Sequence, residues 1–103
     1  MRKLGKDFLL PAADIEWIQA WGNYVNLHVR GHDYPLRSTM AAIERRLDGK
    51  RFVRVHRSYI VNLDFVQTIT PLESGEARIG LSTGGEVPVS RRYRDALKQL
   101  SMA

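Results

Sequence analysis

Short runs of strand-forming residues, separated by glycine-containing turns, fill most of the chain and restrict its fold more than any other feature. Residues 15–20 and 24–30 are two such runs, and Gly22-Asn23 between them predicts a hairpin turn. In the second run Val and Leu alternate with polar residues, so we expect one face of that strand to be in water. The segment "GHDYPLR" follows as a turn and an edge strand, because its proline cannot donate to a hydrogen-bond ladder.

A second meander of strands is predicted over residues 65–90. Its turns are residues 73–75 (Glu-Ser-Gly) and 83–85 (Thr-Gly-Gly), which carry the residue types that turns favour. A chain of 103 residues is long enough for one modest core and too short for two. We therefore expect a mainly β, antiparallel fold and a single domain over residues 1–103.

One segment before residue 50 has a helical pattern instead. Ser38 or Thr39 is a candidate N-cap, and Gly49 stands where a C′ residue would end the helix. The apolar stripe that should face the core consists of Met40, Ile43 and Leu47. We expect a helix near residues 39–48.

A second, short helix is predicted near residues 91–100. Ser90 is its candidate N-cap, and its apolar stripe would consist of Tyr93, Leu97 and Leu100. Arg91 and Arg92 fall in the first turn, where the helix dipole disfavours cations. Either a bound anion offsets this cost, or one arginine pairs with Asp95 while the other points into water.

The segment "RFVRVHRSYIVNL", residues 51–63, reads as a strand interrupted by His56, Arg57 and Ser58. Alternation places two sets of apolar residues on opposite faces: Val53, Val55, Tyr59, Val61 and Leu63 on one, and Phe52 and Ile60 on the other. A strand with a local irregularity at residues 56–58 would project these three side chains from a rim while the apolar neighbours anchor it. Such a rim is a recognition surface.

The net charge of +5 is concentrated in two stretches of the chain. Residues 45–58 hold six basic residues against one acidic residue, and residues 87–98 hold four against one, while the rest of the chain carries −3. Arginine predominates, and its planar guanidinium suits bidentate recognition of phosphate or guanine. A solvated basic face is the alternative for either stretch alone. Attraction of phosphates without sequence reading is expected from Arg45, Arg46, Lys50, Arg51 and Arg54.

Catalysis and metal binding are not expected. The sequence has no cysteine, which excludes thiolate metal sites and disulfides. His28 and His32 straddle Gly31 in a predicted strand and turn, and no carboxylate cluster stands beside them; His56 and Ser58 lack a third, orienting group. No apolar run approaches the roughly 20 residues that span a bilayer. We therefore expect no enzyme activity, no cofactor, no metal, no membrane contact by this domain and a cytoplasmic location.

Three blocks of the sequence, in this order and at this spacing, resemble the LytTR DNA-binding domain, the output module of many bacterial response regulators. They are "IEWIQAWGNYVNLHV", "FVRVHRSYIVNL" and "GGEVPVSRRYRDAL". The resemblance covers about residues 8–100. It implies an elongated antiparallel β-sandwich of a transcriptional regulator, which docks double-stranded DNA with loops instead of a major-groove helix.

The resemblance also implies which residues contact DNA. Matched onto this chain, the three contact loops hold Asn23, Tyr24, Asn26, His56, Arg57, Ser58, Ser90, Arg91 and Arg92. Asn23, Arg57 and Arg92 would enter the DNA grooves. The two arginines are the best candidates for base reading, since a guanidinium can bind guanine O6 and N7 together.

Simpler roles stay open for four of these residues. Asn23 could be the left-handed residue of its turn, and Tyr24 could be half-buried. His56 could be a hydrogen-bond donor that organises its loop, and Ser58 could cap the turn.

The resemblance implies partners as well. Members of the family usually occupy paired direct repeats on double-stranded DNA, so we expect weak self-association on DNA. A receiver or sensor domain would lie outside this chain.

The rival class is a β-rich RNA-binding or protein-interaction module. RNA binders of the RRM and OB kinds expose aromatic side chains for base stacking. Four large aromatics of this chain fit core positions, namely Trp17, Phe52, Tyr59 and Phe65. Trp21 and Tyr34 do not fit such positions, and competition between single-stranded RNA and duplex DNA would separate the classes.

Overall fold

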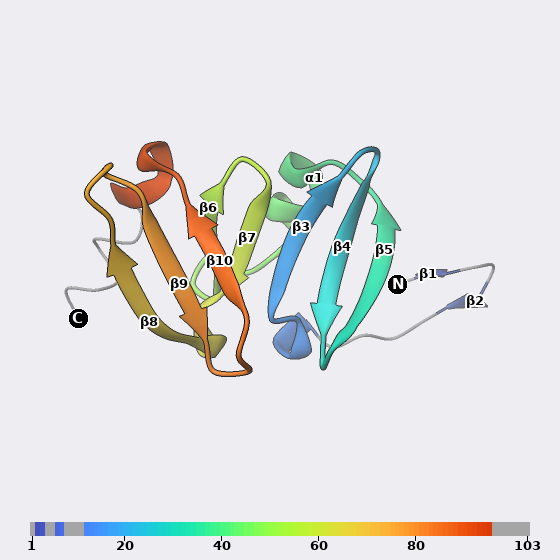
Figure 1. Cartoon of the computed structure of the whole chain (residues 1–103). Helices are drawn as coiled ribbons and strands as arrows, with labels where there is room; N and C mark the ends of the chain where they lie inside the picture. The colour runs from blue at the N-terminus through green and yellow to red at the C-terminus, as the bar shows by residue number, and fades with distance from the viewer. Residues whose placement is uncertain (1, 4–5, 8–11, 96–103) are drawn as a thin grey trace.

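The computed structural model describes residues 2–3, 6–7 and 12–95. The fold of these residues is mainly β, and the molecule measures 46 × 24 × 21 Å along its principal axes (Figure 1). The strands are β1 (Arg2–Lys3), β2 (Lys6–Asp7), β3 (Trp17–Trp21), β4 (Tyr24–Val29), β5 (His32–Arg37), β6 (Phe52–His56), β7 (Tyr59–Asn62), β8 (Val66–Pro71), β9 (Ala77–Leu81) and β10 (Glu86–Val89). The helical elements are α1 (Met40–Arg46) and the 3-10 turns η1 (Ala12–Asp14), η2 (Leu63–Phe65) and η3 (Arg91–Tyr93).

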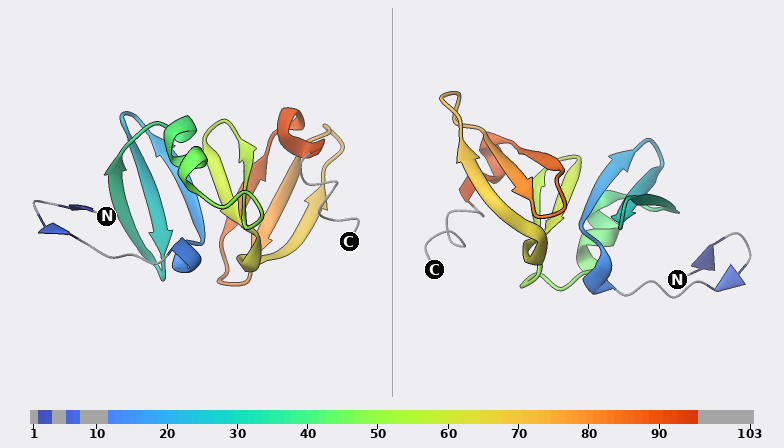
Figure 2. Two further views of the ribbon diagram at one scale, coloured as in Figure 1. Left: turned by 180° about the vertical axis from the view of Figure 1, so that it is seen from behind. Right: turned by 60° about the horizontal axis from the view of Figure 1, so that its bottom comes forward.

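Two antiparallel sheets form the body of the domain. The first has the strand order β5-β4-β3-β7-β6, and the second has the order β10-β9-β8. Figure 2 shows the two sheets side by side along the length of the molecule. β5 is an edge strand, as Pro35 predicts. The predicted elongated antiparallel β architecture is confirmed.

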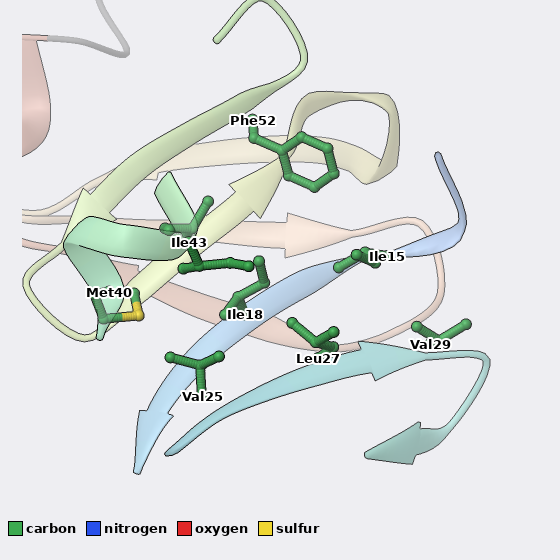
Figure 3. Close-up of a cluster of buried hydrophobic side chains, with 9 residues drawn as sticks. Ile15, Ile18, Val25, Leu27, Val29, Met40, Ile43 and Phe52 are labelled. Atoms are coloured by element: carbon green, nitrogen blue, oxygen red, sulfur yellow. The ribbon is translucent and has the colours of Figure 1, made fainter. Parts of the chain in front are cut away.

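The first core lies between the five-stranded sheet and α1 (Figure 3). Ile18, Val25 and Leu27 of the β3–β4 hairpin face Met40 and Ile43 of the helix, and all five are at least 93% buried. Full burial of each aliphatic side chain contributes about 1.5–3 kcal/mol. The predicted apolar stripe of the helix therefore packs as expected.

The second core lies between the β8–β10 sheet and the β6–β7 hairpin. Its most deeply buried side chains are Val55, Val61, Ile79, Val87 and Val89. Phe52 and Ile60, their neighbours in sequence, belong to the first core. The predicted alternation is confirmed for residues 52–61, whereas Leu63 begins the η2 turn and belongs to neither core. The β6–β7 hairpin joins the two cores because each of its faces belongs to one of them.

The helix prediction is confirmed at the start of α1 and wrong at its end. Thr39 is the N-cap, and its Oγ1 accepts a hydrogen bond from the N–H of Ala42 at 3.0 Å. The helix ends at Arg46, and Gly49 does not adopt the left-handed conformation of a C′ residue. Leu47 is extended instead and packs against the first core, so burial of its side chain ends the helix two residues early.

The C-terminal helix begins as the 3-10 turn η3, and residues 94–95 continue it in helical conformation. Ser90 occupies the N-cap position, but its side chain makes no capping hydrogen bond, so the predicted cap is wrong in that respect. Residues 96–100, with Leu97 and Leu100 of the predicted stripe, lie outside the described residues.

Three buried polar side chains depart from the simple alternation. Asn62 is fully buried; its Nδ2 donates to the carbonyl of Ile15 at 2.8 Å, and its Oδ1 accepts from the N–H of Asp64 at 2.9 Å. The Glu16 carboxylate accepts from the Thr83 hydroxyl at 2.7 Å and is 3% exposed. Asn26 is 6% exposed, so the expectation that the polar face of its strand is in water is wrong at this position.

Candidate nucleic-acid interface

The three loops predicted to contact DNA lie along one edge of the molecule. Figure 1 shows the β3–β4 turn, the β6–β7 turn and η3 at the upper ends of their strands, and the rear view in Figure 2 shows the same alignment. We call residues 22–23, 57–58 and 90–92 the loop edge.

Backbone hydrogen bonds hold the loop edge together. The N–H of Ala20, at the end of β3, donates to the carbonyl of Ser58 at 2.8 Å. The N–H of Ser90, at the end of β10, donates to the carbonyl of Val55 at 3.0 Å. The β6–β7 hairpin is therefore bonded to both neighbouring loops, and their spacing does not depend on flexible side chains.

The segment predicted as one interrupted strand is a hairpin. β6 and β7 are joined by a turn at Arg57 and Ser58, with a register shift between Arg54 and His56. The N–H of Ser58 donates to Nδ1 of His56 at 3.1 Å, and the His56 ring meets the Tyr59 ring edge-on at 5.4 Å. His56 thus organises its loop as an acceptor at Nδ1 and not as the predicted donor there.

Arg54 has a role that the charge pattern did not reveal. Its Nε donates to the carbonyl of His56 at 3.3 Å, and its Nη2 donates to the carbonyl of Arg57 at 2.6 Å. Its Nη1 also reaches Glu44 of α1 at 3.2 Å, and its guanidinium carbon lies 5.8 Å from the centre of the Tyr93 ring. The expectation that Arg54 attracts phosphates is therefore replaced: its guanidinium fixes the β6–β7 turn against α1 and η3.

The three arginines of the loop edge differ from Arg54, because their guanidiniums have no partner in the part of the chain that the structure describes. Among the described residues, Arg57, Arg91 and Arg92 make no hydrogen bond or ion pair through their side chains, and all three are exposed. The alternative in which one arginine pairs with Asp95 is absent from this part of the chain. Three cations on one edge are therefore not neutralised by any described side chain.

The β8–β9 turn supports η3 from beside the loop edge. Gly75 has a φ of +93°, and a Cβ there would come within 2.6 Å of the Arg91 Cδ. Arg94 donates to the carbonyl of Gly75 at 3.1 Å. The aliphatic part of Arg91 therefore rests on a glycine that leaves room for it.

The β3–β4 turn leaves Asn23 available for contact. Gly22 has a φ of +60°, whereas Asn23 is not left-handed, so the alternative that Asn23 is the left-handed turn former is wrong. Its side chain is exposed and makes no hydrogen bond within the described part of the chain. Tyr24 is 46% exposed, which matches the half-buried prediction. Asn26 lies two residue pairs further into the sheet than Tyr24, opposite Gln19, and is the candidate that the structure does not bring to the edge.

No metal centre accompanies these loops. Among the described residues no group of three or more His, Cys, Asp or Glu side chains is placed to hold a metal ion. In the same part of the chain no helix is long and apolar enough to cross a membrane.

Comparison with known proteins identifies the domain type. The family described as the LytTr DNA-binding domain matches residues 5–102, nearly the whole chain. The chain belongs to the LytTR family. The resemblance carried by the three sequence blocks is thereby confirmed, and the family is one of DNA-binding domains.

Relatives of this LytTR domain include proteins with further segments. The sensory transduction protein LytT of Bacillus subtilis (strain 168) is 32% identical over 92 residues, which cover 89% of this chain and 38% of LytT. The CO-responsive transcriptional regulator RcoM of Rhodospirillum rubrum is 38% identical over 94 residues, which cover 88% of this chain and 39% of RcoM. The chain thus spans about two fifths of the length of these curated relatives.

A solved structure supports the LytTR fold. The LytTr DNA-binding domain of a methyl-accepting/DNA response regulator from Bacillus cereus superposes with a TM-score of 0.85 at 21% identity. The match covers 96% of this chain and 91% of that one, so the two chains share their fold over nearly their whole length.

Proposed function

We propose that this LytTR domain binds double-stranded DNA in a sequence-specific manner as the output domain of a bacterial transcriptional regulator. The observation that carries the proposal is a set of exposed arginines that have no partner among residues 12–95, on a loop edge whose backbone is fixed by hydrogen bonds. Unpaired cations on a rigid edge complement a regular array of phosphates, and preorganised loops lose little entropy on binding.

We assign base contacts to some residues of the loop edge and phosphate contacts to others. Arg57 and Arg92 are proposed to bind guanine O6 and N7 in the major groove, with Asn23 as a third groove contact. Arg91 and the hydroxyl of Ser90 are proposed as phosphate contacts, which fix register without reading sequence. His56 and Ser58 hold each other across the turn through Nδ1 of the ring, which leaves Nε2 of His56 and the Ser58 hydroxyl for DNA.

A salt titration tests the proposal directly. The domain should bind duplex DNA, and the logarithm of its affinity should fall linearly with the logarithm of salt, by about 0.9 for each phosphate neutralised. Three to five phosphate contacts would thus give a slope between roughly −3 and −5. Fluorescence anisotropy with a labelled duplex measures it. A flat salt response, or no binding at low salt, would show that the proposed function is wrong.

Paired sites provide a second test. One domain of this size covers few base pairs, so we expect weak binding to a half-site and tighter binding to two direct repeats one or two helical turns apart. Changing the spacing by about five base pairs, half a helical turn, should abolish the gain because the second copy then faces another side of the duplex. Affinity that is indifferent to phasing would contradict self-association on DNA.

The remainder of a longer regulator would provide the input. Because the chain spans about two fifths of the curated relatives it matches, we propose that a receiver or sensor domain adjoins it. Cytoplasmic action is part of the same proposal, since DNA is the partner.

A further inference from the structure

The β3–β4 hairpin exposes an aromatic side chain that the three DNA loops do not use. Trp21 is 69% exposed, the highest value among the exposed large apolar residues described. Tryptophan is costly to leave in water, and exposed aromatics are enriched where proteins bind partners. Trp21 directly precedes the Gly22-Asn23 turn, so it adjoins the loop edge.

Two further exposed side chains continue a row from Trp21. The strand register places Trp21 opposite Tyr24 and Tyr24 opposite Arg37. Residues opposite one another in antiparallel strands project from the same face, with Cβ atoms about 4.5–5.5 Å apart. The three side chains therefore form one row across the end of the five-stranded sheet, which we call the aromatic–arginine row.

The row lies on the face of the sheet that α1 does not cover. Ala20, Val25 and Leu36 alternate with the row residues along their strands and pack with the first core beneath α1. Successive side chains of a strand point to opposite faces, so Trp21, Tyr24 and Arg37 point away from that core. Tyr24 is 46% exposed, and Arg37 is exposed without a hydrogen bond or ion pair among the described residues.

The charge of the row favours a polyanion over a neutral or cationic partner. The Arg37 guanidinium is not neutralised among the described residues. Asp33, the acidic residue of β5, is held by Nδ1 of His28 at 2.9 Å, four residue pairs further along the ladder.

We propose that the aromatic–arginine row binds the sugar–phosphate backbone of duplex DNA beyond the Asn23 turn. Bases inside a duplex are stacked, so an aromatic ring outside the grooves meets the apolar side of a deoxyribose, while arginine and a hydroxyl meet phosphate oxygens. Such contacts fix position and add affinity without reading sequence. This inference rests on the proposed function and adds a contact surface to it.

Substitution of the row separates this contact from base reading. Trp21→Ala should weaken binding about five- to tenfold on the specific site and on random duplex alike, so that their ratio is unchanged. Arg37→Ala should lower the salt slope by about 0.9. Ile69→Ala is the matched control, because it removes an exposed apolar side chain from β8, and it should leave affinity unchanged.

Tryptophan fluorescence gives an independent readout. The chain has two tryptophans, and Trp17→Phe leaves Trp21 as the single one. Quenching of this variant by acrylamide should fall at least twofold when duplex is added, because DNA covers the ring. Unchanged quenching together with unchanged Trp21→Ala affinity, in a domain that still binds duplex, would overturn the inference and leave the proposed function standing. Trp21→Ala should also be tested with single-stranded RNA. If this variant loses affinity for single-stranded RNA and keeps its affinity for duplex DNA, the inference is overturned in favour of base stacking on Trp21. Failure of the unaltered domain to bind duplex would overturn both.

Discussion

Arg54→Ala should destabilise the domain by about 2 kcal/mol and weaken specific DNA binding about tenfold, although its guanidinium faces inward. The side chain is 19% exposed and bonds two carbonyls of the β6–β7 turn. Hydrogen bonds from a charged donor contribute about 1.5–3 kcal/mol, whereas the ion pair with the half-exposed Glu44 contributes little. Without the guanidinium the turn loses its fixed position, so Arg57 would be ordered only on binding. Urea denaturation and anisotropy at low temperature measure the two effects.

Arg46→Ala is the matched control for this prediction. Arg46 lies in the last turn of α1, is exposed and has no side-chain partner among the described residues, so its loss changes the net charge equally. The unfolding free energy of the Arg46→Ala variant should differ from that of the unaltered domain by less than about 0.5 kcal/mol, and its affinity for DNA should change only slightly. Arg54→Lys should remain as unstable as Arg54→Ala, because one ammonium cannot span both carbonyls in the guanidinium geometry. Equal behaviour of Arg54→Ala and Arg46→Ala would show that Arg54 acts only through its charge.

The strands and hairpins that contain glycine were predictable because glycine is a local signal. Gly22, Gly75 and Gly84 take positive φ in the turns where they were expected. The β6–β7 turn was read as an irregular strand because Arg57 and Ser58 carry no such signal and neither has a positive φ. The hydrogen bond from the Ser58 N–H to the His56 ring stabilises this turn in place of a glycine with positive φ. Alternation nevertheless assigned the two faces of the hairpin to the right cores.

Long-range polar contacts could not be predicted from periodicity. Asn62 is bonded to Ile15, which lies 47 residues earlier in the chain, and Glu16 is bonded to Thr83, which lies 67 residues later. Neither hydrogen bond has a signal in the local sequence, so Asn62 and Glu16 could not be distinguished from ordinary exposed polar residues. The same limit applied to Arg54: counting charge placed it in a basic stretch but could not show which carbonyls it bonds.

The candidate site was predictable in its loops and less so in its residues. Charge counting marked two of the three loops, and the family resemblance supplied the third. The family resemblance predicted Asn26 as a DNA contact. Asn26 is instead buried within the sheet, because Gln19 and Pro35 flank it on the neighbouring strands. Trp21 stood out as an aromatic without a core position, and its exposure bears this out.

Arg57→Ala and Arg92→Ala should each cost about 1–3 kcal/mol on the specific site and much less on random duplex. Both guanidiniums are exposed, project from loops fixed by backbone bonds and have no partner in the described part of the chain. A bidentate contact to guanine disappears entirely with the guanidinium, whereas a phosphate contact weakens every sequence equally. Their loss should therefore lower the ratio of specific to nonspecific affinity.

Arg45→Ala is the control for Arg57→Ala and Arg92→Ala. Arg45 lies in the last turn of α1, away from the three loops in sequence, and also has no described side-chain partner. Its loss should weaken both affinities modestly and equally, and all three variants should unfold within about 0.5 kcal/mol of the unaltered domain. The decisive quantity is the affinity ratio for each variant at one fixed salt concentration. Should Arg57→Ala and Arg92→Ala leave that ratio unchanged, both arginines would be phosphate contacts, and base reading would pass to the exposed Asn23 or to Nε2 of His56.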